Sequence, residues 1–131
     1  MTTDIPLISI VDDDDTVRAA TESLVRSLGF ETRTFASAES FLQSSSPQET
    51  RCLILDVQMP NMSGIELQER LSELGFEIPI MFITAFPDEA VRQRAMEAGA
   101  VAFLLKPFEV YGQRFIDCLF ETLKQDKRSA P

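Results

Sequence analysis

In "LISIVDDDDTVRAA", residues 7–20, a mainly apolar run passes directly into four consecutive aspartates and then into a helix-like pattern. Four adjacent carboxylates repel one another at pH 7, and a chain that needed only solubility would space them apart. Acids that follow a buried strand indicate a site instead, because open parallel sheets bind ligands at the carboxyl ends of their strands. Some of the four acids at 12–15 are therefore expected to bind a ligand.

Strand-like runs recur along the chain at intervals that leave room for helices. Four of the five runs are continuously apolar, as in strands that are covered on both faces. Their regular alternation with helical segments predicts right-handed crossovers and a parallel sheet between two helix layers, an α/β three-layer sandwich. The predicted strands are 7–11, 31–35, 52–56, 80–84 and 102–105.

The helical segments have recognisable beginnings and ends. Ser37 is a candidate cap for a short second helix, and Ser63 with Glu66 has the spacing of a capping box. The first helix is expected to stop at Gly29, and the fourth, within 88–99, at its final glycine. The last helix carries apolar residues at helical spacing, namely Phe115, Leu119 and Leu123.

Composition limits the classes of function. A chain of 131 residues is long enough for one domain with its own core. The net charge of -9 argues against direct binding to nucleic acid or an anionic membrane, since both attract a cationic face. Neither a signal peptide nor a membrane-spanning run is recognisable, so we expect a cytoplasmic protein. Histidine is absent, which excludes His-based triads and metal sites with histidine ligands. Cys52 and Cys118 are interpreted as core residues in a reducing compartment.

Polar side chains follow four of the predicted strands at the edge where ligands bind. Carboxylates suit a hard divalent cation, and Mg²⁺ typically takes one or two of them together with waters and phosphate oxygens. A further carboxylate can attack phosphorus, while the cation, an ammonium and a hydroxyl stabilise the phosphoryl oxygens. The residues at this edge are Asp12 and Asp13 after the first strand, Asp56 at the end of the third, Thr84 at the end of the fourth and Lys106 after the fifth.

Four motifs in order give the chain a family resemblance. They are "VDDD" after the first strand, "LILDVQMPNMSGIEL" around the third, "FITA" around the fourth and "FLLKPF" around the fifth. With these motifs the chain resembles the receiver domain of two-component response regulators over residues 6–108. "SAESFL" and "AMEAGAVAFLLKPF" are most similar to the FixJ subclass. The resemblance implies a flavodoxin-like (βα)5 fold with a five-stranded sheet in the order 2-1-3-4-5.

The resemblance also implies roles at the acidic edge. Asp56 matches the aspartate that accepts a phosphoryl group, and Asp12 and Asp13 match the acidic pair that holds Mg²⁺, with Mn²⁺ as a substitute. Asp13 is then the direct ligand, Asp12 acts largely through water, and the backbone carbonyl of Gln58 is a further ligand. Lys106 matches the lysine that pairs with the phosphoryl group.

Two further positions match the conformational switch of the family. Thr84 matches the switch hydroxyl, and Phe103 matches the aromatic residue that turns inward, although a Phe on a strand is as often a plain core residue. The Lys106–Pro107 bond matches a peptide that is commonly cis. Family members usually dimerise on activation through the fourth helix, the fifth strand and the last helix. Phe86 and Gln58 match side chains that tune hydrolysis of the phosphoryl group.

The remaining residues of the motifs receive structural roles. Asp14 and Asp15 are expected to cap and charge the first turn of the first helix, where the helix dipole favours anions. Gly64 is expected to serve a tight turn in the loop after the third strand.

We therefore expect a signalling switch rather than an enzyme, phosphorylated by a sensor histidine kinase and capable only of self-catalysed phosphotransfer and slow autodephosphorylation. The predicted receiver domain spans 1–123, and 124–131 is a polar tail or the start of a linker to an effector domain that controls transcription. A stand-alone receiver that acts in a phosphorelay or on a protein partner is the alternative.

Two other classes of function use similar residues. Aspartyl-phosphate phosphatases and phosphotransferases usually place the nucleophile in a D-x-D pair after the first strand and carry a cap domain. Receiver-like modules that bind partners without phosphorylation normally lack one of the acids or the lysine, all of which are present here.

Overall fold

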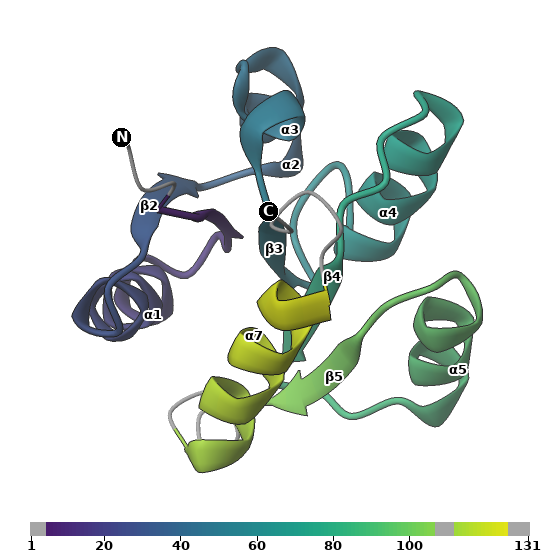
Figure 1. The fold of residues 1–131 in the computed structure, drawn as a ribbon. Helices are drawn as coiled ribbons and strands as arrows, with labels where there is room; N and C mark the ends of the chain where they lie inside the picture. Colours follow the sequence, from purple (N-terminus) through teal and green to yellow (C-terminus); the bar gives the residue numbers. More distant parts are fainter. Residues whose placement is uncertain (1–4, 107–111, 126–131) are drawn as a thin grey trace.

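The computed structural model describes residues 5–106 and 112–125, which form a parallel five-stranded sheet in the order β2-β1-β3-β4-β5 (Figure 1). This is the predicted order, and every strand begins and ends where its run of residues predicted. The edge strand β2 is partly exposed, which explains why its sequence, "ETRTF", is mainly polar instead of apolar throughout. The strands are β1 (Leu7–Val11), β2 (Glu31–Phe35), β3 (Cys52–Asp56), β4 (Ile80–Thr84) and β5 (Ala102–Leu105).

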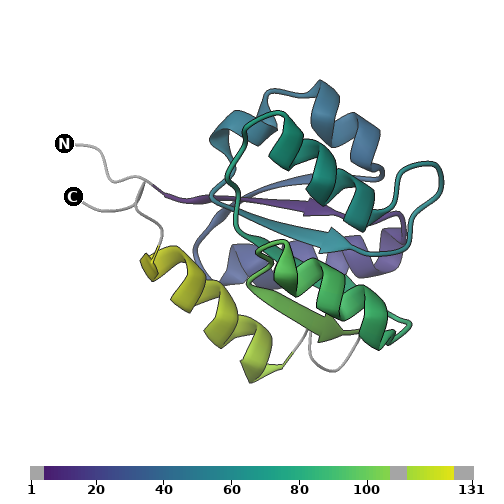
Figure 2. The same ribbon diagram turned by 90° about the vertical axis from the view of Figure 1, so that its right-hand side faces the viewer.

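Helices cover both faces of the sheet (Figure 2). The apolar side chains of α1 and α7 pack on one face, against residues such as Ile8, Ile54 and Ile83. Those of α2, α4 and α5 pack on the other face, against residues such as Leu55 and Phe82. The helices are α1 (Asp15–Ser27), α2 (Ala38–Gln43), α3 (Ser46–Glu49), α4 (Gly64–Glu73), α5 (Glu89–Glu97) and α7 (Gln113–Gln125).

The predicted helix ends are present, and the caps at the starts of α1 and α4 lie in the loops at the carboxyl edge. Asp14 caps α1 by accepting hydrogen bonds from two backbone N–H groups of the first turn. Ser63 and Glu66 form a reciprocal capping box at the start of α4, directly after the loop that follows β3. Gly29 and Gly99 adopt the positive φ values of 99° and 104° that end α1 and α5.

One element was not predicted, and one prediction cannot be compared with the described residues. The single turn α3 has no sequence period that would predict it. The predicted cis peptide between Lys106 and Pro107 lies outside the described residues. Within the described ranges, no helix is both long enough and apolar enough to cross a membrane. Cys52 is buried in the core, and Cys118 is partly buried and packs against the same core, as predicted for core residues.

Candidate functional site

The three acids at the ends of β1 and β3 converge as the motifs predicted. Val11 pairs with Leu55 in the sheet, so that Asp12 and Asp56 extend from neighbouring strands at the same level. One carboxylate oxygen from each of Asp12, Asp13 and Asp56 lies within 4.8 Å of the other two. Asp12 is fully buried and Asp56 is 4% exposed, whereas Asp13 is exposed at the mouth of the site.

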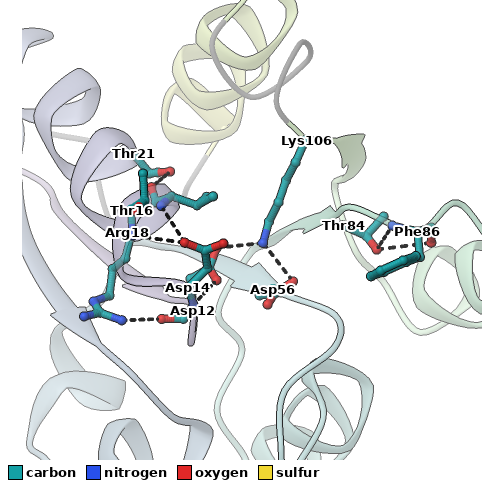
Figure 3. A network of polar contacts seen from close by, with 10 residues as sticks. Asp12, Asp14, Thr16, Arg18, Thr21, Asp56, Thr84, Phe86 and Lys106 are labelled. Carbon is teal, nitrogen blue, oxygen red and sulfur yellow. Dashed lines mark hydrogen bonds and ion pairs between the residues drawn. The ribbon is translucent and has the colours of Figure 1, made fainter.

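Lys106 reaches both buried acids from the end of β5 (Figure 3). Its Nζ lies 3.0 Å from Oδ2 of Asp12 and 3.3 Å from Oδ1 of Asp56. The backbone N–H of Lys106 donates to the carbonyl of Thr84, which continues the pairing of β5 with β4 and aims the side chain inward. A single cation therefore faces two carboxylates, and the cluster retains an excess of negative charge.

Burial and, after it, this excess charge change the protonation of the site. Burial, together with the negative charge of Asp12, raises the pKa of Asp56 to about 7, although Lys106 acts in the opposite direction. For Lys106, burial lowers the pKa, but the hydrogen bonds and charges of Asp12 and Asp56 outweigh burial and raise it. Lys106 is thus a fixed cation, and the ionised form of Asp56 is a strained, desolvated carboxylate that gains from any additional positive charge.

The donor set of this cluster fits a small divalent cation. Oδ2 of Asp12 is buried, and its one partner within the described residues is the ammonium of Lys106, which it shares with Asp56. An under-satisfied buried carboxylate beside two further carboxylates is the oxygen-rich surrounding that Mg²⁺ prefers, and Mn²⁺ accepts the same donors. The side chains present are therefore compatible with the predicted metal site.

The cluster opens to solvent through a pocket of about 360 Å³. Asp13, Asp56 and Lys106 line it together with Gln58 and Phe86, which places both of the predicted tuning side chains at its rim. Gln58 and Phe86 are exposed, and Phe86 retains 63% of its accessible surface. The pocket has room for a tetrahedral group beside Asp56.

Thr84 lies at the same edge, but its hydroxyl is not directed toward the acids. Oγ1 accepts a hydrogen bond from the backbone N–H of Phe86 at 3.0 Å and donates to the carbonyl of Phe86 at 3.2 Å (Figure 3). The residue itself is almost fully buried at 1% exposure. In this conformation the backbone of Phe86 satisfies the Thr84 hydroxyl, and the role of Thr84 as a switch stays a prediction.

Phe103 lies in the middle of β5 and is half buried. Its ring contacts the ring of Phe82 on β4 at a centroid distance of 6.1 Å and packs against the core of that face. This arrangement suits a plain core residue as well as a switch residue, so the switch role of Phe103 stays a prediction.

Gly64 has a different role from the predicted tight turn. It is the first residue of α4, and its φ is not among the positive values in the described chain. A Cβ atom at this position would lie 2.3 Å from the backbone carbonyl oxygen of Asp56. The absence of a side chain therefore lets the loop from Val57 to Ser63 fold back on the end of β3, with Gly64 N–H donating to the carbonyl of Val57.

The four opening aspartates divide into two pairs, as predicted. Asp14 and Asp15 are exposed and belong to the start of α1, with Asp14 accepting from Thr16 N–H and Val17 N–H. Sequence reasoning did not identify Arg18, whose Nη1 donates to the backbone carbonyl of Asp12 at 2.7 Å. The only sequence signal for this contact is the spacing of three between Asp15 and Arg18, which is common on helix surfaces.

Comparison with known proteins gives one consistent family. The profile of the response regulator receiver domain matches residues 8–112. The response regulator protein TmoT of Ectopseudomonas mendocina is 43% identical over 128 residues, which are 95% of this chain and 57% of that protein. Curated relatives of this kind are longer, and the chain spans 53%, 57% and 45% of three of them.

Solved structures agree with the sequence comparison. The response regulator StyR superposes with a TM-score of 0.85 at 46% identity, covering 95% of this chain and 62% of that chain. The crystal structure of FixJ-N has a TM-score of 0.80 at 34% identity and covers 94% of this chain and 97% of that one. The similarity to FixJ that the motifs suggested is thus present in both sequence and fold.

Proposed function

The chain belongs to the response regulator receiver domain family, and on this premise we propose that Asp56 accepts a phosphoryl group from a sensor histidine kinase. The observation that carries the proposal is the position of Asp56, a buried carboxylate at the floor of an open pocket. Two more acids lie within 4.8 Å of it and a lysine ammonium lies 3.3 Å away. A desolvated carboxylate with this access is a suitable nucleophile for phosphorus.

The transfer exchanges one bond to phosphorus for another. An Asp56 oxygen forms a bond to phosphorus while the bond from phosphorus to the imidazole nitrogen of the kinase histidine breaks, and the imidazole leaves. Mg²⁺, when bound, supplies positive charge to the phosphoryl oxygens. We assign its ligands to Asp13 directly, Asp12 largely through water, Asp56, and the backbone carbonyl of Gln58. Lys106 is the fixed cation that pairs with the product.

The chain itself supplies the groups for this step, so the proposed activity is self-catalysed phosphotransfer followed by slow autodephosphorylation. Phe86 covers part of the pocket entrance with an exposed apolar ring, which limits the approach of attacking water. A phosphatase acting on separate substrates is disfavoured, since the nucleophile stands alone after β3 instead of in a D-x-D pair after β1.

Phosphorylation is proposed to move Thr84 and Phe103. The Thr84 hydroxyl leaves the backbone of Phe86 for the phosphoryl oxygens, and the ring of Phe103 turns into the space that Thr84 vacates. The surface that changes is formed by α5, β5 and α7. Apolar side chains on this side are already partly exposed, with Val101 at 43% and Leu105 at 38%. A phosphorylation-dependent homodimer through this face follows as the proposed result.

The proposed receiver domain spans 1–123, with 124–131 as a tail or the start of a linker. Its relatives include regulators that are longer than this chain. If this chain is likewise part of a longer protein, the proposed output is control of transcription through an effector domain. A receiver that works alone in a phosphorelay or on a protein partner is the alternative, since the site is the same in both cases.

The phosphorylation proposal is tested by incubating the protein with acetyl phosphate and Mg²⁺ and measuring the intact mass. We expect the addition of one phosphoryl group to the parent and none to Asp56→Asn, because an amide is not a nucleophile here. Asp117→Asn, an exposed acid on α7, is the control that should label like the parent. Labelling of Asp56→Asn at another residue would remove Asp56 from the site, and steady release of phosphate without a labelled protein would favour the phosphatase.

The dimer proposal is tested separately with beryllofluoride, which mimics the phosphoryl group. Light scattering should report a higher mass for the parent with beryllofluoride and Mg²⁺, and an unchanged mass for Asp56→Asn. A parent that takes up the phosphoryl group but stays monomeric at high concentration would support the stand-alone alternative.

A further inference from the structure

The side chain of Arg18 turns back from α1 toward the end of β1 (Figure 3). Its Nη1 donates to the backbone carbonyl of Asp12 at 2.7 Å, and its Nη2 lies 2.5 Å from Oδ1 of Asp15. Only 20% of the Arg18 side chain is exposed, whereas that of Asp15 is 86% exposed. An exposed i,i+3 ion pair contributes only about 0.3–0.5 kcal/mol, so the charge-assisted bond to the carbonyl is the more important contact of the two.

The carbonyl that Arg18 binds belongs to the peptide unit between Asp12 and Asp13. Asp12 is held from two other sides, by its N–H donating to the carbonyl of Phe35 at 3.1 Å and by its Oδ1 accepting from Asp14 N–H at 2.9 Å. Neither of these two bonds involves the carbonyl. Because the peptide unit is planar, fixing its oxygen also fixes the direction of the Asp13 N–H and hence the point where the Asp13 side chain begins.

The position of Asp13 matters because its hydrogen bond with Asp56 is lost when both acids are ionised, which is the state that a cation binds. Asp13 is exposed, and its carboxylate shares a site with two buried carboxylates that repel it. A side chain free to swing into water would have to be brought back on each binding event, and this ordering would weaken the affinity for the cation. A restraint on its backbone removes part of that cost.

We propose that Arg18 is a positioning residue, which fixes the Asp12–Asp13 peptide and thereby raises the affinity of the acidic site for Mg²⁺. The inference rests on the proposed function of that site and adds to it a residue from α1 that touches neither the cation nor the phosphoryl group. Residues that orient metal ligands in this way typically change metal affinity by about 10–100-fold.

Geometry rather than charge is the basis of this role. The pKa of Asp56 is set by burial and by Asp12, Lys106 and Asp13, and Arg18 is not among its causes. The planar guanidinium uses two nitrogens at once, one on the carbonyl and one on Asp15, whereas a lysine ammonium carries the same charge without this fork. Arg18→Lys therefore separates the two explanations.

The test is a thermal melt at increasing Mg²⁺ concentration, which gives the concentration of half-maximal stabilisation for each variant. Arg18→Lys and Arg18→Gln are expected to need about ten-fold more Mg²⁺ than the parent. Arg26→Lys, at an exposed position in the last turn of the same helix, should match the parent within about two-fold. With acetyl phosphate, the Arg18 variants should label slowly at low Mg²⁺ and recover toward the parent rate at high Mg²⁺.

A merely structural role would lower the melting temperature in EDTA and leave the Mg²⁺ midpoint unchanged, and that result would overturn the proposal. A variant that no longer folds would assign Arg18 to the stability of the domain and would overturn it as well. Failure of the proposed function is distinguishable, because the parent and Arg26→Lys would then show neither a Mg²⁺ shift nor labelling.

Discussion

β1 and β3 are buried along their whole length. Burial nevertheless has a different effect on the stability of the fold in the interior of each strand and at its carboxyl end. Ile54 is fully buried among apolar side chains of α1 and α7, and such burial stabilises the fold. Asp56, two residues later on β3, is nearly as buried but lies among charges, and such burial destabilises the fold. Burial to a similar degree therefore stabilises the fold at Ile54 and destabilises it at Asp56. The destabilised carboxyl end of β3 is also the end that carries the proposed reactive group.

The largest effect is expected in the strand interior. Ile54→Ala should lower the free energy of unfolding by about 3–4 kcal/mol, because it removes buried methyl groups and leaves a cavity. Urea denaturation followed by circular dichroism measures this loss. Asp56→Asn in metal-free buffer is the matched variant on the same strand, and it should unfold at a higher urea concentration than the parent. A loss of stability in both variants would remove the contrast between the two ends of β3.

The pH dependence of stability isolates the carboxyl end. An acid whose folded pKa is raised from 3.8 to about 7 binds its proton more tightly in the folded state. Its contribution to stability is therefore complete below about pH 4 and is lost as the pH rises through about 7. We expect the parent in EDTA to lose about 2 kcal/mol relative to Asp56→Asn between pH 5 and pH 8, less than the full shift implies because solvent at the pocket screens the charge. Parallel pH profiles for the two proteins would contradict the raised pKa.

Asp13 tests the repulsion at the mouth of the site. Two unit charges ~5 Å apart repel by roughly 3 kcal/mol at an effective dielectric of about 20, and solvent around the exposed Asp13 reduces this to about 1 kcal/mol. Asp13→Asn should therefore melt slightly higher than the parent in EDTA and phosphorylate poorly. It should also lose most of the stabilisation by Mg²⁺, which for the parent is about 1.4 kcal/mol at ten-fold saturation. If Asp13→Asn melts lower in EDTA or keeps the full magnesium shift, Asp13 is a structural residue.

An effect of similar size and opposite sign is expected one residue farther along, where the acid stabilises the fold by capping a helix. Asp14→Ala should cost about 1 kcal/mol, because two N–H groups at the start of α1 lose their acceptor. Asp88→Ala removes the equivalent cap from α5 and should cost a similar amount. Differential scanning fluorimetry with and without Mg²⁺ should show the same loss under both conditions for both variants. A magnesium-dependent loss for Asp14→Ala alone would place Asp14 in the metal site.

The sequence could predict those features that depend on local pattern. The bounds of four of the five strands followed from continuous apolar runs, and the caps at Asp14 and Ser63 followed from side chains that satisfy the first helical N–H groups. The convergence of Asp12, Asp56 and Lys106 followed from a general property of parallel sheets, in which all carboxyl ends share one edge. The strand order itself came from the family resemblance, because no local pattern specifies which strands are neighbours.

Features that depend on tertiary contacts could not be predicted from the sequence. The bond from Arg18 to the carbonyl of Asp12 depends on how α1 returns over β1, and the need for glycine at position 64 depends on the path of the backbone near Asp56. The hydrogen bonds of Thr84 with Phe86 depend on the path of the backbone after β4, which no local sequence pattern specifies. The single turn α3 is too short for a periodic pattern to identify it.

The central place of β3 in the sheet also sets the order of events during refolding. The segment between β1 and its neighbour β3 includes β2, α2 and α3. The chain must therefore lose the entropy of closing a long loop before the contacts between β1 and β3 can stabilise it. The acids of β1 and β3 then meet Lys106 only when the crossovers to β4 and β5 have also closed. We therefore expect the carboxyl edge to assemble last, and its backbone amides to be the first of the sheet to exchange hydrogen with solvent.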